Sequence, residues 1–356
     1  MISLLIVAAL GMMLPPFAEQ IKQINGNEKS KDEINSQPNE ASLNYVETEN
    51  EYELSGRWFE KEINGIKMQV TLNDGAMIYF KIKGTDSVVV NFEVISEQEV
   101  PYFAYVIDGM EPIRQPITNG KILLPDKGEH VVWLVIDGMN EWEDKWNEEK
   151  GVAFKGLESS GVIKGIQPTT ARILFIGDSI SIGVKALSDN SISNYNSATN
   201  SFAWYVSKKL NVEPYFVAYG ATGILATGSF QKTSVMLDSY SANRPAELPA
   251  CDLIVVNCGT NDSDAPNDLF YKGYQELLLK LHERYPENII LCIVPLTQTH
   301  VEEIRQVALP FIWCNVVETK DWEITYTDNV HPDVNGAKKM ADYLEQFIRA
   351  KVWKME

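Results

Sequence analysis

Basic residues are scarce in this chain. Of its 356 residues, 31 are Lys or Arg and 49 are Asp or Glu, which gives a formal net charge of −18. Phosphate binding needs clustered Lys and Arg, so this balance argues against a nucleic-acid partner and against docking to an anionic membrane surface. A neutral polymer or a small ester is compatible with it, as is the simpler interpretation that the acidity keeps the protein soluble.

Cysteine is also sparse, and its pattern predicts no metal site. The four cysteines lie in the second half of the chain, each in or beside an apolar run: Cys251, Cys258, Cys292 and Cys314. They form no CxxC pair, and no Cys/His spacing matches a metal site. Packed free thiols are the simplest interpretation. A disulfide also fits, so the cysteines leave the cellular compartment open.

Long apolar runs are limited to residues 1–18, MISLLIVAALGMMLPPFA, which carry no charge and precede polar sequence. This pattern is typical of the apolar core of a secretory signal peptide. Pro15 and Pro16 disfavour a spanning helix, and about 17 apolar residues is the short limit for a span. An uncleaved anchor is the alternative, because no Lys or Arg precedes the run. We expect a secreted or cell-surface-anchored protein whose membrane attachment, where it exists, uses only this segment.

The sequence changes character twice before residue 165. Residues 19–45 are rich in Asn, Glu, Lys and Ser, which predicts a flexible linker. Residues 46–160 show short apolar runs separated by turn signals such as Asn73-Asp74-Gly75 and Asn119-Gly120, with no helical period between them. The strands predicted there are Ile66–Leu72, Met77–Ile82, Val88–Val94, Phe103–Ile107, Lys121–Leu124, Val131–Ile136 and Val152–Gly156. This spacing predicts an all-β sandwich of the jelly-roll type.

Residues 165–356 alternate between strand and helix patterns. The predicted strands are buried apolar runs: Arg172–Ile176, Tyr215–Tyr219, Asp252–Asn257 and Ile289–Val294. The predicted helices are Ser201–Leu210, Leu269–Arg284 and Val334–Ala350. The fold class is therefore α/β, with a C-terminal doubly wound parallel sheet preceded by an all-β jelly roll. In such sheets the site lies at the carboxyl ends of the strands.

Gly177-Asp178-Ser179 directly follows the first of these parallel strands. A nucleophile must be exposed at a strand end, and the glycine allows the tight turn that presents Ser179. We expect Ser179 to begin the next helix, whose N-terminal amides favour negative charge. The structural alternative is that Asp178 and Ser179 only cap that helix.

His331 stands just before the last predicted helix, in Asp328-Asn329-Val330-His331-Pro332. Histidine can take a serine proton near neutral pH, and a carboxylate three residues earlier can hold the ring in the required tautomer. The pattern predicts His331 as the base and Asp328 as its orienting acid. The histidines without such a context are expected to be structural: His130, His282 and His300.

Two further loops offer donors for the oxyanion of a tetrahedral intermediate. In Gly259-Thr260-Asn261-Asp262 the Asn261 amide can donate, and in Gly220-Ala221-Thr222-Gly223 a glycine N–H can. The Ser179 N–H would be the third donor. Either loop alone can be a simple turn, because Gly and Asn dominate turns. Together with the nucleophile and base, the loops satisfy the requirements of an acyl-transfer site.

These four blocks resemble the SGNH hydrolase superfamily, also called GDSL esterases, over residues 171–350. The resemblance implies these roles: Ser179 as nucleophile, His331 as base, Asp328 as the triad acid and Asn261 as an oxyanion donor. The glycine loop reads Tyr-Gly-Ala-Thr-Gly where the family has Ser-Gly-x-Gly. By its spacing Gly223 is the implied glycine donor, with Gly220 as the alternate.

A jelly roll followed by an SGNH domain is similar to carbohydrate esterase family 2. Three local features agree with this resemblance: Gly56-Arg57, Phe80–Thr85 and Asn200–Ala203. The family implies an acetylesterase of the acetylxylan esterase type, which removes O-acetyl groups from plant-wall polysaccharides such as xylan or glucomannan. It requires neither a metal nor an organic cofactor, and its partner is an acetylated polysaccharide or oligosaccharide.

Two alternatives stay open. The same chemistry can serve O-acetyl groups of peptidoglycan, another acylated glycan or a lipid ester, although the sequence shows no apolar lid segment for long acyl chains. The other alternative is a non-catalytic glycan-binding protein, because jelly rolls often bind carbohydrate and Trp133, Trp142 and Trp146 offer stacking faces. The simpler interpretation places Trp133 in the core and the other two in loop packing.

Overall fold

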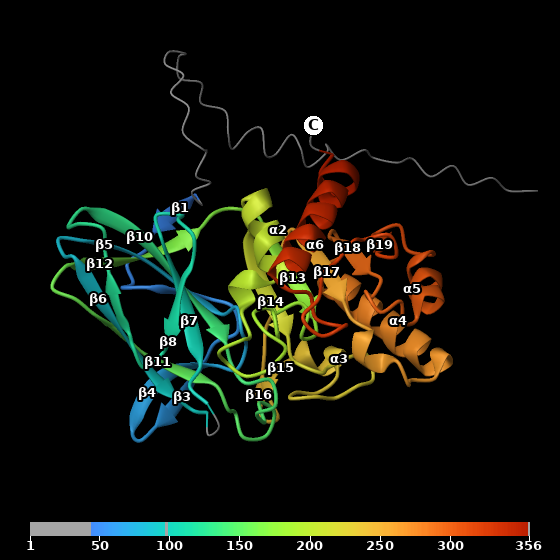
Figure 1. Ribbon diagram of the computed structural model, residues 1–356, viewed down its shortest axis with the longest axis horizontal. Helices are drawn as coiled ribbons and strands as arrows, with labels where there is room; N and C mark the ends of the chain where they lie inside the picture. Colours follow the sequence, from blue (N-terminus) through green and yellow to red (C-terminus); the bar gives the residue numbers. More distant parts are fainter. Residues whose placement is uncertain (1–43, 97–98, 355–356) are drawn as a thin grey trace, which may run out of the picture. The chain divides into compact units, whose positions relative to one another are not determined.

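The computed structural model describes residues 44–96 and 99–354 (Figure 1). The predicted signal or anchor, residues 1–18, and the linker up to residue 43 lie outside the described residues. Contacts group the described residues up to Glu345 into one compact unit, and the described residues beyond Glu345 belong to a second. In the described part of the second unit, a π-helical turn covers Ile348–Val352. No helix within residues 44–96 and 99–354 is both long and apolar enough to cross a membrane.

Two antiparallel sheets form the sandwich at the N-terminal end of the large unit. The seven-stranded sheet has the order β1 (Tyr45–Glu47), β12 (Val162–Pro168), β5 (Met77–Lys83), β10 (Glu129–Gly138), β7 (Tyr102–Ile107) and β8 (Ile113–Pro116), with β2 (Glu53–Ser55) also paired to β5. The five-stranded sheet has the order β3 (Phe59–Ile63), β4 (Ile66–Thr71), β11 (Val152–Glu158), β6 (Ser87–Val94) and β9 (Lys121–Leu123). Because β12 pairs with β5, the sandwich continues beyond the boundary that we predicted at residue 160.

Both faces of the central strands β5 and β10 are buried, which explains their long apolar runs. Alternate residues of β5 and β10 point into the core between the sheets: Ile78, Phe80, Ile82, Val132, Leu134 and Ile136. Their neighbours pack on the opposite face in a second cluster, which includes Trp204 of α2 (Phe202–Leu210): Met77, Tyr79, Trp133 and Val135. Trp133 is thus a core residue, as the simpler interpretation of the sequence predicted.

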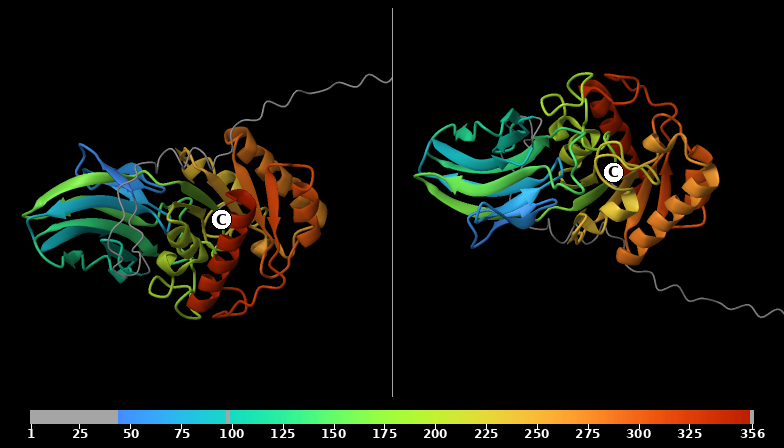
Figure 2. Two further views of the ribbon diagram at one scale, coloured as in Figure 1. Left: turned by 90° about the horizontal axis from the view of Figure 1, so that it is seen from above. Right: turned by 90° about the horizontal axis from the view of Figure 1, so that it is seen from below.

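A five-stranded parallel sheet follows, in the order β14 (Glu213–Ala218), β13 (Arg172–Gly177), β17 (Leu253–Asn257), β18 (Ile289–Ile293) and β19 (Cys314–Val317). Helices α2 and α6 (Val334–Phe347) cover one face (Figures 1 and 2). Helices α3 (Thr233–Met236), α4 (Asn267–Arg284) and α5 (Val301–Ala308) cover the other. This is a doubly wound sheet of flavodoxin-like strand order, so the predicted fold class is confirmed.

Buried polar contacts join the sandwich to the carboxyl end of β14. The Arg57 guanidinium, 1% exposed, donates from Nε to the hydroxyl of Tyr219 over 3.3 Å. Asn73 Nδ2 donates to the carbonyl of Ala218 over 2.9 Å. Gly75 has φ +84°, and a Cβ there would lie 2.3 Å from the ring of Phe216, so the turn needs glycine. These contacts hold sandwich loops beside the loop that follows β14.

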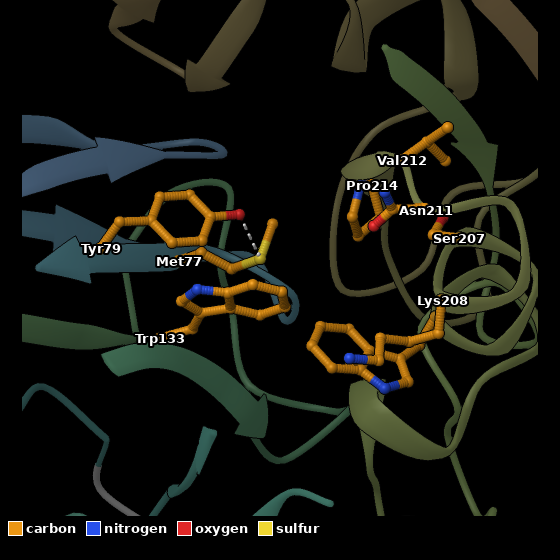
Figure 3. A pocket seen from close by; sticks show the side chains of 9 residues that line it. Met77, Tyr79, Trp133, Ser207, Lys208, Asn211, Val212 and Pro214 are labelled. Carbon is orange, nitrogen blue, oxygen red and sulfur yellow. Dashed lines mark hydrogen bonds between the residues drawn. The ribbon is translucent and has the colours of Figure 1, made fainter. Parts of the chain in front are cut away.

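A small cavity separates the outer face of the sandwich from α2. Figure 3 shows Met77, Tyr79 and Trp133 on one side of it, and Lys208 and Asn211 on the other. Its volume is about 10 Å³, which is room for roughly one water molecule. This cavity is therefore a gap in the packing and too small for a sugar ring.

Candidate active site

Ser179 lies two residues beyond the end of β13, and its side chain is buried at 3% exposure. The expectation that Ser179 begins a helix is wrong, because residues 179–185 form turns and residues 186–189 form bends. Gly183 has φ +68°, a left-handed conformation that ends any helical path. The N–H of Val184 instead bonds to the Ser179 carbonyl over 3.0 Å. Ser179 is therefore followed by turns and not by a helix.

The structure brings together the three residues predicted as nucleophile, base and acid. His331 Nε2 lies 2.9 Å from Ser179 Oγ. On the other side of the ring, His331 Nδ1 lies 2.9 Å from Asp328 Oδ2 and 3.1 Å from Oδ1. A carboxylate that accepts the Nδ1 hydrogen leaves the Nε2 lone pair facing the serine hydroxyl. The arrangement can therefore move the serine proton to the histidine.

Asp328 is held in place by several donors at once. Its Oδ1 accepts the backbone N–H groups of His331 (2.8 Å) and Val330 (3.1 Å). Lys185 Nζ donates to its Oδ2 over 2.8 Å. Partial burial alone would raise the pKa of Asp328, but the hydrogen bonds from Lys185 and His331 outweigh it and hold the pKa well below its usual range. Asp328 therefore stays ionised wherever a histidine titrates.

Lys185 is a site residue that the sequence reasoning missed. It follows Ser179 by six positions in a segment without regular secondary structure, and no motif marks it. The hydrogen bond to Asp328, opposed by desolvation, raises the pKa of Lys185. Its ammonium therefore remains charged beside the triad and competes with the imidazole for the same carboxylate oxygen.

The predicted oxyanion loops lie against each other. Asn261 Nδ2 donates to the carbonyl of Thr222 over 2.8 Å, and the amide carries a second hydrogen that can serve a ligand. The Gly223 N–H donates to the carbonyl of Ala226 over 3.1 Å. A Gly223 donor would need that bond to open, so the oxyanion roles of Gly223 and Gly220 stay predictions.

Asp262 fixes the glycine loop from the neighbouring strand end. Its carboxylate accepts the N–H groups of Ile224 (2.8 Å), Leu225 (2.8 Å) and Ala226 (2.9 Å). A Cβ on Gly223 would lie 2.3 Å from Asp262 Oδ2. Glycine is therefore required at 223 by close approach to this carboxylate, whichever amide binds the oxyanion.

Glu141, from the loop between β10 and β11, lies beside Gly220 of the glycine loop. No sequence motif predicted this position. Glu141 is 6% exposed, and a Cβ on Gly220 would lie 2.6 Å from its Oε1. Burial raises the pKa of Glu141, and the positive charges of His331 and Lys145 offset part of that rise. The sandwich therefore places a carboxylate within electrostatic range of the base.

The remaining predicted features have structural partners. His130 Nδ1 lies 2.7 Å from Asp108 Oδ2. The other two histidines stack on aromatic rings, His282 on Trp313 and His300 on Phe270. The four cysteines are free thiols. Among residues 44–96 and 99–354, no group of three or more His, Cys, Asp or Glu is arranged to hold a metal ion.

Comparison with known proteins gives matches in structure but not in sequence. No family model and no curated protein matches the chain. A family two carbohydrate esterase from Clostridium thermocellum, solved with cellohexaose, is 20% identical with a TM-score of 0.67, over 85% of this chain and 99% of that one. The acetyl xylan esterase Est2A from Butyrivibrio proteoclasticus is 18% identical with a TM-score of 0.69, over 88% and 100%.

The chain has the fold of the family 2 carbohydrate esterases. A salicylyl-acyltransferase, SsfX3, from a tetracycline biosynthetic pathway is also similar, at 12% identity and a TM-score of 0.61 over 86% of this chain and 98% of that one. The fold therefore accommodates acyl transfer to different acceptors, and the reaction must be argued from the site.

Proposed function

We propose that this protein is a serine esterase that removes O-acetyl groups from polysaccharide, such as acetylated xylan or glucomannan, through an acetyl-enzyme. The observation that carries the proposal is the chain of contacts from Ser179 through His331 to Asp328, with heavy-atom distances of 2.9 Å at both links. That geometry suits nucleophilic catalysis at a carbonyl. The fold of carbohydrate esterases supports a glycan as the substrate.

The reaction has two steps. His331 Nε2 takes the hydroxyl proton as Ser179 Oγ bonds to the acetyl carbon, which gives a tetrahedral oxyanion. The bond from that carbon to the sugar oxygen then breaks, and the sugar leaves with the proton from His331. Water attacks the acetyl-enzyme in the same way, releases acetate and restores the serine. The backbone N–H groups of Val330 and His331 hold Asp328 so that the imidazole stays aligned.

The oxyanion is stabilised by the Asn261 amide, the Ser179 N–H and one glycine amide of the loop after β14. Gly220 is preferred over Gly223, because the Gly223 N–H already donates to Ala226. Removing one such donor costs about 10²–10³ in rate in comparable sites. We further propose that the protein is secreted or cell-surface anchored, on the basis of the apolar segment at residues 1–18.

Acyl transfer to an acceptor other than water is the second candidate, favoured by the similarity to the salicylyl-acyltransferase. Peptidoglycan, another acylated glycan or a lipid ester are alternative substrates for the same chemistry. A binding protein without catalysis is the last alternative. The aligned serine and histidine argue against that last role, since binding alone requires no hydrogen bond between them.

Acetate release from acetylated xylan and glucomannan by the full chain tests the proposal. The expected result is release by the wild type, none by Ser179→Ala, and continued release by Ser181→Ala. Ser181 is a matched control, because it is also buried and its Oγ accepts from Asn257 Nδ2 over 3.2 Å. Equal release by Ser179→Ala, or acetate that appears only on an added acceptor, would refute the hydrolytic assignment.

A further inference from the structure

A groove lies between two loops that the triad does not use. One wall is residues 227–231, after β14, and the other comes from the loop between β10 and β11: Trp142, Asp144, Trp146 and Asn147. Its volume is about 420 Å³, within the range of about 300–1,000 Å³ typical of ligand sites. The groove is thus large enough for a ligand, whereas the cavity beside α2 is not.

Contacts connect this groove to the active site. The N–H of Ser229 donates to the carbonyl of Gly220 over 3.3 Å, and the N–H of Lys145 donates to the carbonyl of Ser229 over 3.2 Å. Gly220 follows β14, which pairs with β13 in the register Gly177 with Ala218. The loop after β14 therefore extends from the strand end adjacent to Ser179, and the sandwich loop packs against it.

Trp142 lines this groove, and two hydrogen bonds hold it in place. It is 62% exposed, unusual for so large an apolar side chain. Its Nε1 donates to Ser191 Oγ over 2.8 Å, and its backbone N–H donates to Asn140 Oδ1 over 2.8 Å. The preceding residue, Glu141, is the carboxylate within range of His331. Trp142 is therefore an oriented, solvent-facing platform one residue from the active-site wall.

The rest of the lining indicates the class of ligand. Trp146 is partly buried and packs edge-on against Phe230, with ring centroids 5.0 Å apart, so it builds the wall. Amides, hydroxyls and the Asp144 carboxylate line the remainder, and no Lys or Arg is among the described lining residues, which disfavours an anion. A fatty chain would leave these polar groups without partners. A pyranose ring, with an apolar C–H face and hydroxyls around its edge, matches an aromatic platform bordered by amides.

We propose that this groove is a glycan subsite in which Trp142 stacks on a sugar ring next to the acetylated one. The proposal rests on the proposed function, because it assigns the substrate chain a path from the triad into the groove. Trp142 then contributes to capture of a polymer and contributes nothing to hydrolysis of an ester too small to reach it.

The test compares two substrates in the full-length enzyme: acetylated xylo-oligosaccharides and 4-nitrophenyl acetate. For Trp142→Ala we expect kcat/KM to fall about tenfold on the oligosaccharides, the scale of a well-placed aromatic contact, mainly through KM. On the aryl acetate it should stay within about twofold. Trp142→Phe should recover most of the loss, and Leu123→Ala, an apolar residue of similar exposure (66%) on β9, should match the wild type.

The outcomes separate the subsite from the function. If the wild type deacetylates the oligosaccharides and Trp142→Ala does so equally well, the subsite is wrong and the esterase stands. Equal losses on both substrates would also overturn it, because they would indicate damage to the catalytic centre. If the wild type cleaves only the aryl acetate, the glycan assignment falls, and the subsite falls with it.

Discussion

The Lys185–Asp328 ion pair makes a quantitative prediction about the pH dependence of the enzyme. Lys185 Nζ and His331 Nδ1 lie 2.8 and 2.9 Å from the same oxygen, Asp328 Oδ2. The two nitrogens are therefore at most about 6 Å apart. At that distance the Lys185 charge disfavours a positive charge on the imidazole by about 0.7 kcal/mol at an effective dielectric constant of about 80, and by about 2.8 kcal/mol at about 20. Lys185→Met removes that repulsion and frees the carboxylate for the ring.

The expected result is an acid limb of the kcat/KM profile that moves to higher pH by about 0.5–2 units, since 1.36 kcal/mol corresponds to one unit. The assay is 4-nitrophenyl acetate turnover from pH 4 to 9, with Lys185→Arg as the control that keeps the charge. The plateau rate at high pH should change little, because the neutral imidazole is the active form. An acid limb that does not move, or that moves to lower pH, would refute the electrostatic role of Lys185.

Three other residues around the triad and the glycine loop give further predictions: Glu141, Asn261 and Gly223. Glu141→Gln removes a negative charge near the base, so its acid limb should move to lower pH in the same assay, opposite to Lys185→Met; a shift in the same direction would contradict the account. Asn261→Ala should lower kcat by about 10²–10³ with little change in KM, and an unchanged kcat would exclude the amide as an oxyanion donor. Gly223→Ala places a Cβ 2.3 Å from Asp262 Oδ2 and should destabilise the fold by about 1–3 kcal/mol in urea unfolding; wild-type stability would show that the loop can yield.

The sequence predicted the triad because each of its members carries a local signature. Ser179 follows a glycine at the end of an apolar strand, and Asp328 precedes His331 by three positions. The loops that follow β13 and β19 both leave the sheet at its carboxyl edge, which brings Ser179 and His331 together. Lys185 and Glu141 have no local signature, since their place beside the triad depends on tertiary contacts of irregular loops. They could be found only in the folded structure.

The fold was predicted less well where elements are short or polar. Strands β1 and β12 pair with each other at the edge of the sheet and contain Lys, Gln and Glu between few apolar residues. Their strand pattern is therefore weak. The helix expected at Ser179 fails because Gly183 and Lys185 adopt positive φ values of 68° and 57°. Such backbone reversals are set by loop packing, and residue patterns do not reveal them.

The measurement that tests the central claim most directly is active-site labelling with a serine-directed fluorophosphonate, followed by peptide mapping. If Ser179 is the nucleophile and His331 its base, the wild type should lose activity with one label on Ser179. His331→Ala should label far more slowly, because the hydroxyl then lacks its proton acceptor 2.9 Å away. A label on another residue, or His331→Ala labelled at the wild-type rate, would contradict the account.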